Sequence, residues 1–386
     1  MKKICIIGGC GHVGIPLGLA LASKKFNVTL IDVNKNAVDK INSKTLPFKE
    51  EGAEELLQKH IGKNLIATTD VNKVKEQSVV VFVTGTPVDE HHNPKIKDVL
   101  KIIKTYLPLM NKEQLIILRS TIFTGTTEII YEMLKEELCT VKLAFSPERI
   151  VQVQGIEEIY KLPQIISATS AIARKEADEI FSKVAKKTIH LEPQEAELAK
   201  LMTNTWRYLE FAIANQFYMM AEDKGFDFYK IFNAMKDDYP RAKHFAKAGL
   251  AAGPCLFKDT MQLSAFYGNQ FFLGQSAMLV NEGLPNFLVK QLEEKMGTLK
   301  NKNIALLGLT FKPNNDDIRE SLSYKIKKEL EFKMAKVMMV DPYVEGTVSL
   351  NEVIKKADGF ILGTPHDEFK SLNIKKPFVD CWNVWR

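Results

Sequence analysis

Little in this 386-residue sequence points to a metal site or to disulfide bonds. Its five cysteines lie far apart, and no two of them form a Cys-x-x-Cys pair, which argues against both a disulfide framework and a zinc site. The adjacent pair His91 and His92 has no third ligand at metal spacing and is interpreted as part of a polar loop. We therefore expect no bound metal and a protein of the reducing cytoplasm.

Long apolar runs and clusters of like charge are also missing. No run approaches the roughly 20 apolar residues that a membrane span needs, and the short run Ile4–Ile7 cannot form the core of a signal peptide. The formal net charge of +6 comes from lysines and arginines scattered along the chain, which does not favour nucleic-acid binding. We expect neither a membrane nor a nucleic acid as partner.

The length of the chain is sufficient for two or three domains, because single hydrophobic cores rarely exceed about 250 residues. Hydrophobic residues make up 45% of the sequence and charged residues 26%. Both values are ordinary for a globular protein.

The first 32 residues carry a glycine pattern typical of dinucleotide binding. A short buried strand, Ile4–Ile7, precedes the spacing Gly9-x-Gly11-x-x-Gly14 and an apolar helical pattern. Such glycines allow a tight turn and bring backbone N–H groups to a pyrophosphate. A second strand, Val28–Ile31, ends at Asp32, where a carboxylate would bind ribose hydroxyls and repel a 2′-phosphate. We predict NAD rather than NADP, the alternative being a glycine turn without a ligand.

Further buried runs end in polar residues that we assign to the same site. Val79–Val83 leads into a Gly-Thr-Pro turn, and Leu115–Leu118 leads into Arg119, Ser120 and Thr121. Ligands of parallel sheets bind at the carboxyl ends of the strands, although turn and cap chemistry explains such residues equally well. The predicted cofactor-binding residues of this region are Gly9, Cys10, Gly11, His12, Val13, Gly14, Asp32, Thr86, Pro87, Ser120 and Thr121.

A segment of small residues, Ala248–Pro254, precedes a single cysteine, Cys255, with Lys258 and Asp259 just beyond it. A thiol is a good nucleophile only as thiolate, a form that a nearby cation favours. The plain alternative is a small buried hydrophobe in a turn. The dinucleotide pattern favours the nucleophile, because a nicotinamide cofactor and a reactive cysteine together permit oxidation through a thioester.

A long helix is predicted from about Glu195 to Gly225, a stretch without internal proline or glycine. Glu197, Lys200 and Asn204 share one face of it, and Tyr208 continues that stripe. The face is either part of a site or only solvated. A helix of about 30 residues spans roughly 45 Å, so we expect it to join two domains and to supply a dimer surface.

The strand–helix–strand order predicted for residues 4–32 is repeated after Gly297. The strands Asn303–Leu307 and Lys336–Val340 surround a helical pattern, and the second strand is followed by Asp341. The Gly-x-Gly-x-x-Gly run is absent, so this part is expected to bind something other than NAD. Lys312 and Arg319 would suit a diphosphate, or are simply surface cations.

Together these motifs make the chain similar to the UDP-glucose/GDP-mannose dehydrogenase family over nearly its full length. Besides the glycine pattern with Asp32, the carrying motifs are Gly85-Thr86-Pro87, Arg119-Ser120-Thr121, Ser146-Pro147-Glu148-Arg149, Lys200-x-x-x-Asn204, Gly253-Pro254-Cys255 with Lys258-Asp259, and Gly308-Leu309-Thr310-Phe311-Lys312 with Asp317 and Arg319.

The expected fold is α/β, with two Rossmann-like, doubly wound parallel-sheet domains joined by a central helical domain with one long helix. The expected boundaries are 1–194 for the NAD-binding domain, 195–297 for the central dimerisation domain with the catalytic cysteine, and 298–386 for a C-terminal domain that binds the UDP of a nucleotide sugar. We expect a homodimer.

The resemblance implies oxidation of a sugar C6 alcohol to a carboxylate by two NAD⁺ through a covalent intermediate on Cys255. Lys200 and Asn204 would stabilise the developing oxyanion. Asp259 and Thr121 would order the hydrolytic water.

Glu148 would assist hydrolysis, and Arg319 would contact the cofactor. Arg241 would reach the substrate of a partner subunit. The implied substrate-binding residues are Glu148, Arg149, Lys200, Asn204, Arg241, Gly249, Gly253, Phe311 and Lys312.

Departures from the family pattern concern the substrate. Arg207 resembles the UDP-N-acetylhexosamine branch, whereas Cys255-x-x-Lys258-Asp259 resembles the UDP-glucose and GDP-mannose branches, and Trp382 stands where members often have arginine. We favour a UDP-sugar over GDP-mannose and leave a UDP-hexose or a UDP-N-acetylhexosamine open. Two alternatives are a two-electron dehydrogenase of β-hydroxyacid type and a non-catalytic binding protein for NAD and nucleotide sugars.

Overall fold

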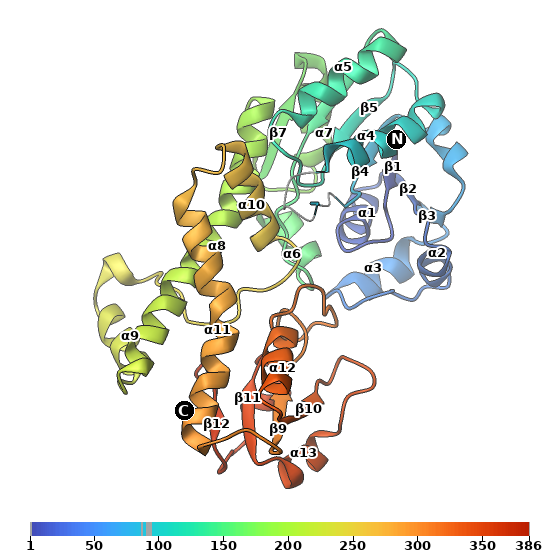
Figure 1. Cartoon of the computed structure of the whole chain (residues 1–386). Coiled ribbons are helices and arrows are strands. Elements are labelled where there is room, and N and C mark those ends of the chain that lie inside the picture. The colour runs from blue at the N-terminus through green and yellow to red at the C-terminus, as the bar shows by residue number, and fades with distance from the viewer. Residues whose placement is uncertain (1, 86–87, 90–94, 386) are drawn as a thin grey trace. The chain divides into compact units, whose positions relative to one another are not determined.

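The computed structural model describes residues 2–85, 88–89 and 95–385. The chain divides into two compact units, Met1–Met202 and Thr203–Arg386. Each unit is described by itself below, with the elements labelled as in Figure 1. Because this division falls inside one helix, the three-domain boundaries given above stay a prediction.

The first unit is built on an eight-stranded sheet with the strand order β3-β2-β1-β4-β5-β6-β7-β8. Its strands are β1 (Lys3–Ile7), β2 (Asn27–Ile31), β3 (Leu65–Thr68), β4 (Val79–Phe82), β5 (Leu115–Leu118), β6 (Lys142–Phe145), β7 (Gln164–Ala168) and β8 (Thr188–His190). Neighbouring strands are parallel from β3 to β6. The expected doubly wound α/β fold is thereby confirmed.

One pair of strands departs from the expected parallel sheet. β7 runs antiparallel to β6, with Ala144 opposite Ala168 and Phe145 opposite Ser167. β8 is again parallel to β7. The sheet therefore changes direction once, at an edge away from the glycine turn that follows β1.

The helices of the first unit connect these strands. They are α1 (Gly14–Ser23), α2 (Lys35–Asn42), α3 (Ala53–His60), α4 (Ile96–Tyr106), α5 (Thr126–Leu138), α6 (Gly155–Lys161) and α7 (Ala171–Phe181), with the short turns η1 (Val71–Glu76) and η2 (Leu107–Leu109).

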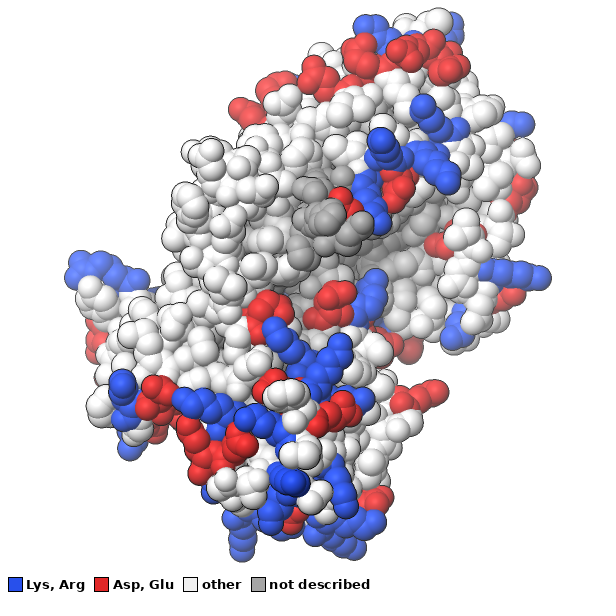
Figure 2. Space-filling view, in the orientation of Figure 1, with Lys and Arg blue, Asp and Glu red and all other residues white. Residues whose placement is uncertain are grey.

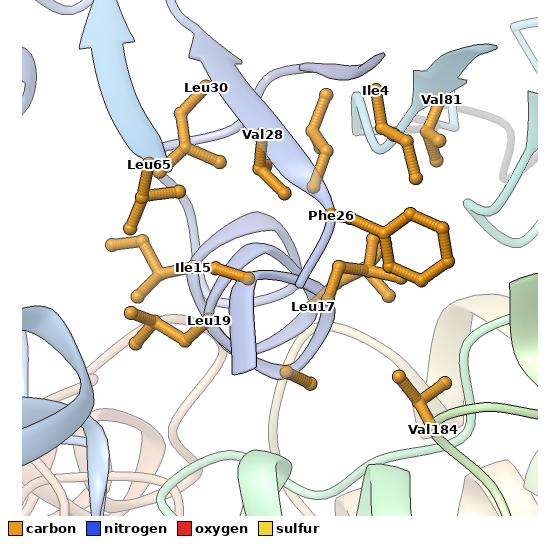
Figure 3. Close-up of a cluster of buried hydrophobic side chains, with 14 of the residues drawn as sticks. Ile4, Ile15, Leu17, Leu19, Phe26, Val28, Leu30, Leu65, Val81 and Val184 are labelled. Carbon is orange, nitrogen blue, oxygen red and sulfur yellow. The ribbon is translucent and has the colours of Figure 1, made fainter. Parts of the chain in front are cut away.

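Helix α1 is buried along nearly its whole length, since nine of its ten residues, Gly14 to Ala22, are shielded from solvent. Figure 3 shows Ile15, Leu17 and Leu19 beside the strand residues Val28 and Leu30. This packing fixes the start of α1 directly after the glycine turn.

The long predicted helix is present as α8 (Pro193–Asp223, 31 residues), two residues earlier at each end than the predicted limits. It begins in the first unit and continues into the second. Along the described residues no helix combines the length and the apolar character that crossing a membrane demands.

The second unit combines helices with a smaller sheet. The sheet has the order β10-β9-β11-β12, and every pair in it is parallel. Its strands are β9 (Asn303–Leu307), β10 (Lys336–Val340), β11 (Gly359–Leu362) and β12 (Phe378–Val379). Its helices after α8 are α9 (Phe228–Lys236), α10 (Leu256–Phe266), α11 (Phe272–Met296), α12 (Ser323–Phe332), α13 (Leu350–Lys356) and α14 (Asp367–Lys370), with the turn η3 (Pro240–Ala242).

One buried cluster of the second unit joins α11 and α12 to β9. Leu288 and Leu292 of α11 lie in one buried cluster with Ile304 and Leu306 of β9 and Ile326 of α12. The segment between η3 and α10 has no regular structure. It carries the small residues that precede Cys255.

Candidate active site

The glycines of the turn after β1 differ in the space that surrounds them. A Cβ on Gly9 would lie 2.6 Å from the carbonyl oxygen of Ile6, and one on Gly14 would lie 2.4 Å from that of Gly9. Both positions therefore require glycine for packing. A Cβ on Gly11 would meet only the Gly8 carbonyl oxygen, at 3.6 Å. The space over Gly11 fits the close approach of a pyrophosphate.

Asp32 lies directly after β2 and is tied to this turn. Its carboxylate accepts the backbone N–H of Cys10 at 3.0 Å and that of Asn34 at 3.0 Å. The residue is only half-buried, and its contact with ribose hydroxyls stays a prediction. Burial, and then the negative charge of Asp32, raise the pKa of the Cys10 thiol to about 12, which leaves Cys10 unreactive near neutral pH.

The other predicted cofactor contacts follow β4 and β5. The Ser120 hydroxyl donates to the carbonyl oxygen of Thr84 at 2.5 Å, and Thr121 is half-buried beside it. His12 stacks on Phe48 with ring centroids 3.8 Å apart. Thr86 and Pro87 lie outside the described residues, as do His91 and His92.

Glu197 of α8 binds the start of α5, a role that its place on the predicted stripe did not indicate. Its carboxylate accepts the N–H of Gly125 at 2.6 Å, the N–H of Thr127 at 2.8 Å and the Thr127 hydroxyl at 2.5 Å. Burial raises the pKa of Glu197, and these hydrogen bonds oppose that rise. The contact anchors the segment that contains Thr121.

Glu148 takes part in a buried ion pair with Arg119. The Arg119 guanidinium is completely buried and lies 2.5 Å from one Glu148 oxygen. The other Glu148 oxygen accepts the backbone N–H groups of Arg149 and Ile150 at 2.8 and 3.1 Å. Both oxygens thus hold the segment after β6 in place, and the hydrolytic role of Glu148 stays a prediction.

Cys255 is the N-cap residue of α10, and its side chain is exposed. A thiolate here would lie at the positive end of the helix dipole. Within the first turn of α10, Asp259 is fully buried. Its carboxylate accepts the Asn204 amide at 2.6 Å and lies 3.4 Å from the Lys258 ammonium. The first turn of α10 therefore brings together four side chains of the second unit: Asn204, Cys255, Lys258 and Asp259.

Arg319 is oriented by Asp317, a partner that the sequence did not reveal. Its guanidinium nitrogens donate to both carboxylate oxygens of Asp317, the shortest distance being 2.6 Å. The hydrogen bonds that Arg319 donates to Asp317 raise the pKa of Arg319, and burial opposes this rise. The Asp317 carboxylate therefore orients the Arg319 guanidinium and favours its charged form.

Four further predicted substrate residues belong to the second unit. Gly253 lies in the loop before Cys255, and Phe311, Lys312 and Arg241 lie outside that loop. Gly253 packs on the ring of Phe311, because a Cβ there would lie 2.6 Å from a ring carbon. Lys312 is half-buried. Arg241 is exposed and stacks on Tyr239, 4.7 Å from the ring centroid.

Two further predicted residues belong to the first unit. Lys200 is buried on α8, and Arg149 donates to the carbonyl oxygen of Pro163. Among residues 2–85, 88–89 and 95–385 no cluster of histidine, cysteine, aspartate or glutamate has the arrangement of a metal site.

Comparison with known proteins identifies the family. Three models of the UDP-glucose/GDP-mannose dehydrogenase family match the chain: the NAD-binding domain over residues 2–185, the central domain over 194–282 and the UDP-binding domain over 305–386. The UDP-N-acetyl-D-mannosamine dehydrogenase of Pyrococcus horikoshii is 30% identical over 383 residues, covering 96% of this chain and 91% of that protein. A UDP-glucose 6-dehydrogenase of Bacillus subtilis is 26% identical, covering 94% and 87%.

Solved structures agree with this assignment. The UDP-D-ManNAc dehydrogenase of P. horikoshii superimposes with a TM-score of 0.90 at 29% identity, covering 96% of this chain and 91% of the other. A UDP-glucose dehydrogenase of Pyrobaculum islandicum has the same fold, with a TM-score of 0.91 at 24% identity, covering 100% and 95%. The chain belongs to the UDP-glucose/GDP-mannose dehydrogenase family and is an NAD-dependent oxidoreductase.

Proposed function

We propose that the protein oxidises the C6 alcohol of a UDP-sugar to the uronate in two steps, with Cys255 as covalent nucleophile. The observation that carries this proposal is the gathering of Asn204, Lys258 and Asp259 at the first turn of α10, whose N-cap residue is the exposed Cys255. NAD⁺ supplies the hydride acceptor for each step, and the family relationship supports its use.

The proposed reaction assigns a role to each of these groups. The alcohol first loses a hydride and its hydroxyl proton to give the aldehyde. The Cys255 thiolate then adds to the aldehyde carbon, and Lys200 and Asn204 stabilise the oxyanion that forms. Loss of a second hydride from the thiohemiacetal, together with its hydroxyl proton, gives a thioester.

Hydrolysis completes the cycle. A water ordered by Asp259 and Thr121 attacks the thioester carbon, the C–S bond breaks, and the thiolate, the carboxylate and the two protons of the water are released, the protons passing to solvent. Glu148 assists this step in the proposal.

The proposed substrate is a UDP-hexose or a UDP-N-acetylhexosamine. The UDP-binding domain model matches residues 305–386, which include Phe311, Lys312 and the Asp317–Arg319 pair. Several relatives with similarity over most of the chain are UDP-N-acetyl-D-mannosamine dehydrogenases, and one is a UDP-glucose 6-dehydrogenase. Arg149, Gly249 and Gly253 are proposed as further substrate contacts.

We further propose a homodimer located in the cytoplasm, in which Arg241 reaches the partner's substrate. Residues 260–281 contain no charged side chain, and Figure 2 shows a surface with few charges over α10 and the first half of α11. Large apolar side chains of the second unit are exposed on α8, α10, α11 and the turn between α10 and α11: Trp206, Ile213, Phe217, Met220, Phe266, Tyr267, Phe272, Leu273 and Leu279. An apolar surface of this kind supports association.

The experiment that tests the proposed reaction counts NADH per uronate. Purified protein is incubated with NAD⁺ and, separately, UDP-glucose, UDP-N-acetylglucosamine, UDP-N-acetylmannosamine, UDP-galactose or GDP-mannose. We expect two NADH for each uronate with one or more UDP-sugars. Cys255→Ser should block uronate formation, and Cys139→Ser, which alters the other exposed cysteine, should not.

One NADH per sugar with an unaffected Cys255→Ser variant would replace the proposal by two-electron oxidation. No NADH with any nucleotide sugar would overturn the proposed substrate class.

A further inference from the structure

We propose that Asn215 is a positioning residue for Cys255: its buried side-chain amide fixes the start of the loop that carries the cysteine. The inference rests on the proposed function for the chemical role of Cys255. Its structural basis lies wholly within the second unit and depends on Asn215, Asn281 and Trp382, to which the proposed reaction gives no role.

The Asn215 side chain binds both backbone groups of Gly249. Its amide nitrogen donates to the Gly249 carbonyl oxygen at 3.0 Å, and its amide oxygen accepts the Gly249 N–H at 2.8 Å. The same nitrogen donates to the Asn281 side-chain oxygen at 2.9 Å, and the Asn281 amide donates to the Tyr208 carbonyl oxygen at 3.1 Å. Asn215 and Asn281 are completely buried, so these bonds replace water and restrict the loop.

An indole ring blocks the other side of Gly249. A Cβ on Gly249 would lie 2.2 Å from a ring carbon of Trp382, so only glycine fits between the ring and the Asn215 amide. The Trp382 ring is held in turn, because its N–H donates to the carbonyl oxygen of Gly363 at 3.0 Å. The backbone at Gly249 therefore has one available position.

The far end of the loop is fixed as well. Gly253 donates its N–H to the carbonyl oxygen of Glu320 at 3.2 Å and has the left-handed φ of +100°. Its backbone packs directly on the Phe311 ring. Cys255 follows two residues later as the N-cap residue of α10. The segment before Cys255 is therefore anchored at both Gly249 and Gly253, and Asn215 provides the anchor at Gly249.

A displaced thiolate should affect the two oxidation steps unequally. Removal of the first hydride gives the aldehyde without using the thiol, whereas the second removal requires the bond between Cys255 and the aldehyde carbon. A misplacement of about 1 Å can lower a rate on the order of a hundredfold. Loss of the Asn215 clamp should therefore slow the second step selectively and allow aldehyde to escape.

The test compares Asn215→Ala with Gln216→Ala, which changes the next residue of α8, an exposed one. In Asn215→Ala we expect uronate formation to fall on the order of a hundredfold, with the KM for NAD⁺ unchanged, because the matched NAD-binding domain ends at residue 185. The ratio of NADH to uronate should exceed two, and hydroxylamine should trap free aldehyde. Gln216→Ala should behave as wild type.

A second variant keeps the test decisive if Asn215→Ala does not fold. Trp382→Phe retains an aromatic ring but loses the hydrogen bond from the indole N–H to Gly363. In this variant the ratio of NADH to uronate should also exceed two, but by less than in Asn215→Ala. Amide hydrogen exchange of residues 248–255, measured without substrate, should be faster in both variants.

Two results would overturn the proposal. Asn215→Ala could lower only the melting temperature and keep two NADH per uronate, which would reduce Asn215 to a stability residue. Unchanged hydrogen exchange in residues 248–255 would contradict the clamp even if the protein proved inactive on every nucleotide sugar, so the two failures are distinguishable.

Discussion

The two sheets use one device at the ends of corresponding strands. In the first unit, Asp32 follows β2 and accepts the N–H of Cys10 in the turn after β1. In the second, Asp341 follows β10 and accepts the N–H groups of Leu309 and Thr310 after β9, at 2.6 and 3.3 Å. Both carboxylates tie a strand end to the neighbouring turn.

The two aspartates differ in what covers them. His366, which is completely buried, lies 3.0 Å from Asp341 through its Nε2 atom. Its Nδ1 atom accepts the N–H of Asn314 at 2.9 Å, so the Nε2 atom carries the proton and donates it to Asp341. Among the described residues no histidine hydrogen-bonds Asp32, which is half-buried. The same topology therefore holds one aspartate covered by a histidine and one that is partly exposed, which adds a second difference to the missing Gly-x-Gly-x-x-Gly run.

The largest expected difference concerns glycines of the two turns. Gly308→Ala should lower the free energy of unfolding by about 3 kcal/mol, because its φ is +88° and the new Cβ would lie 2.3 Å from the Thr364 carbonyl oxygen. Gly11→Ala should change it by less than about 0.5 kcal/mol and instead raise the KM for NAD⁺. Urea unfolding and steady-state kinetics measure the two effects. Equal destabilisation by both variants would remove the distinction between an open and a closed turn.

Asp341→Asn should destabilise the protein by about 2 kcal/mol, because an amide cannot accept all the N–H groups that now bind the carboxylate. The matched change Asp32→Asn should lower stability by less than half as much, since Asp32 is partly solvated. Thermal unfolding of the two variants under one condition provides the comparison. A larger effect at Asp32 would show that cover by His366 is not what separates the sites.

The main effect of Asp32→Asn should be weaker binding of NAD⁺ rather than lower stability. We expect the KM for NAD⁺ to rise about tenfold, as for loss of a hydrogen bond to a charged group, and the preference for NAD⁺ over NADP⁺ to narrow. Kinetics with both cofactors measure this change, with Asp341→Asn as the control that should leave the ratio intact. An unchanged preference would argue that Asp32 does not face the ribose.

The smallest expected effect is a difference in acid stability. Burial raises the pKa of the Asp341 carboxyl, but the hydrogen bonds from His366 and from the Leu309 N–H outweigh it and hold the pKa below its ordinary value. A depressed folded pKa stabilises above the unfolded value of about 3.9 and is lost as the pH falls through the folded value. Between about pH 5 and pH 3 the wild type should lose more melting temperature than Asp341→Asn. Parallel losses would contradict this assignment.

Local sequence was enough to predict most of the fold. The buried runs Val79–Val83 and Leu115–Leu118 form β4 and β5 to within one residue, and α8 has the predicted length to within a residue. β7 (Gln164–Ala168) was not predicted. Its direction against β6 depends on the path of the chain, which no local period encodes.

In the candidate site, too, local sequence predicted some features and missed the contacts between distant residues. Asp32 was predictable because it follows a strand and a glycine pattern at a fixed spacing. The contacts of Asn215 with Gly249 and of Glu197 with Thr127 join residues 34 and 70 positions apart, and the pairing of His366 with Asp341 joins residues 25 apart. Residue spacing does not report such contacts, since they depend on how helices and loops pack.

The claim that Cys255 carries the second oxidation is tested most directly by trapping the covalent intermediate. Enzyme in turnover with NAD⁺ and the accepted UDP-sugar is quenched with acid, digested and analysed by mass spectrometry, with Cys255→Ser processed in parallel. The account predicts a nucleotide-uronyl adduct on the peptide that contains Cys255 and on no peptide of the variant. Sustained uronate formation by Cys255→Ser, with no adduct in either sample, would contradict it.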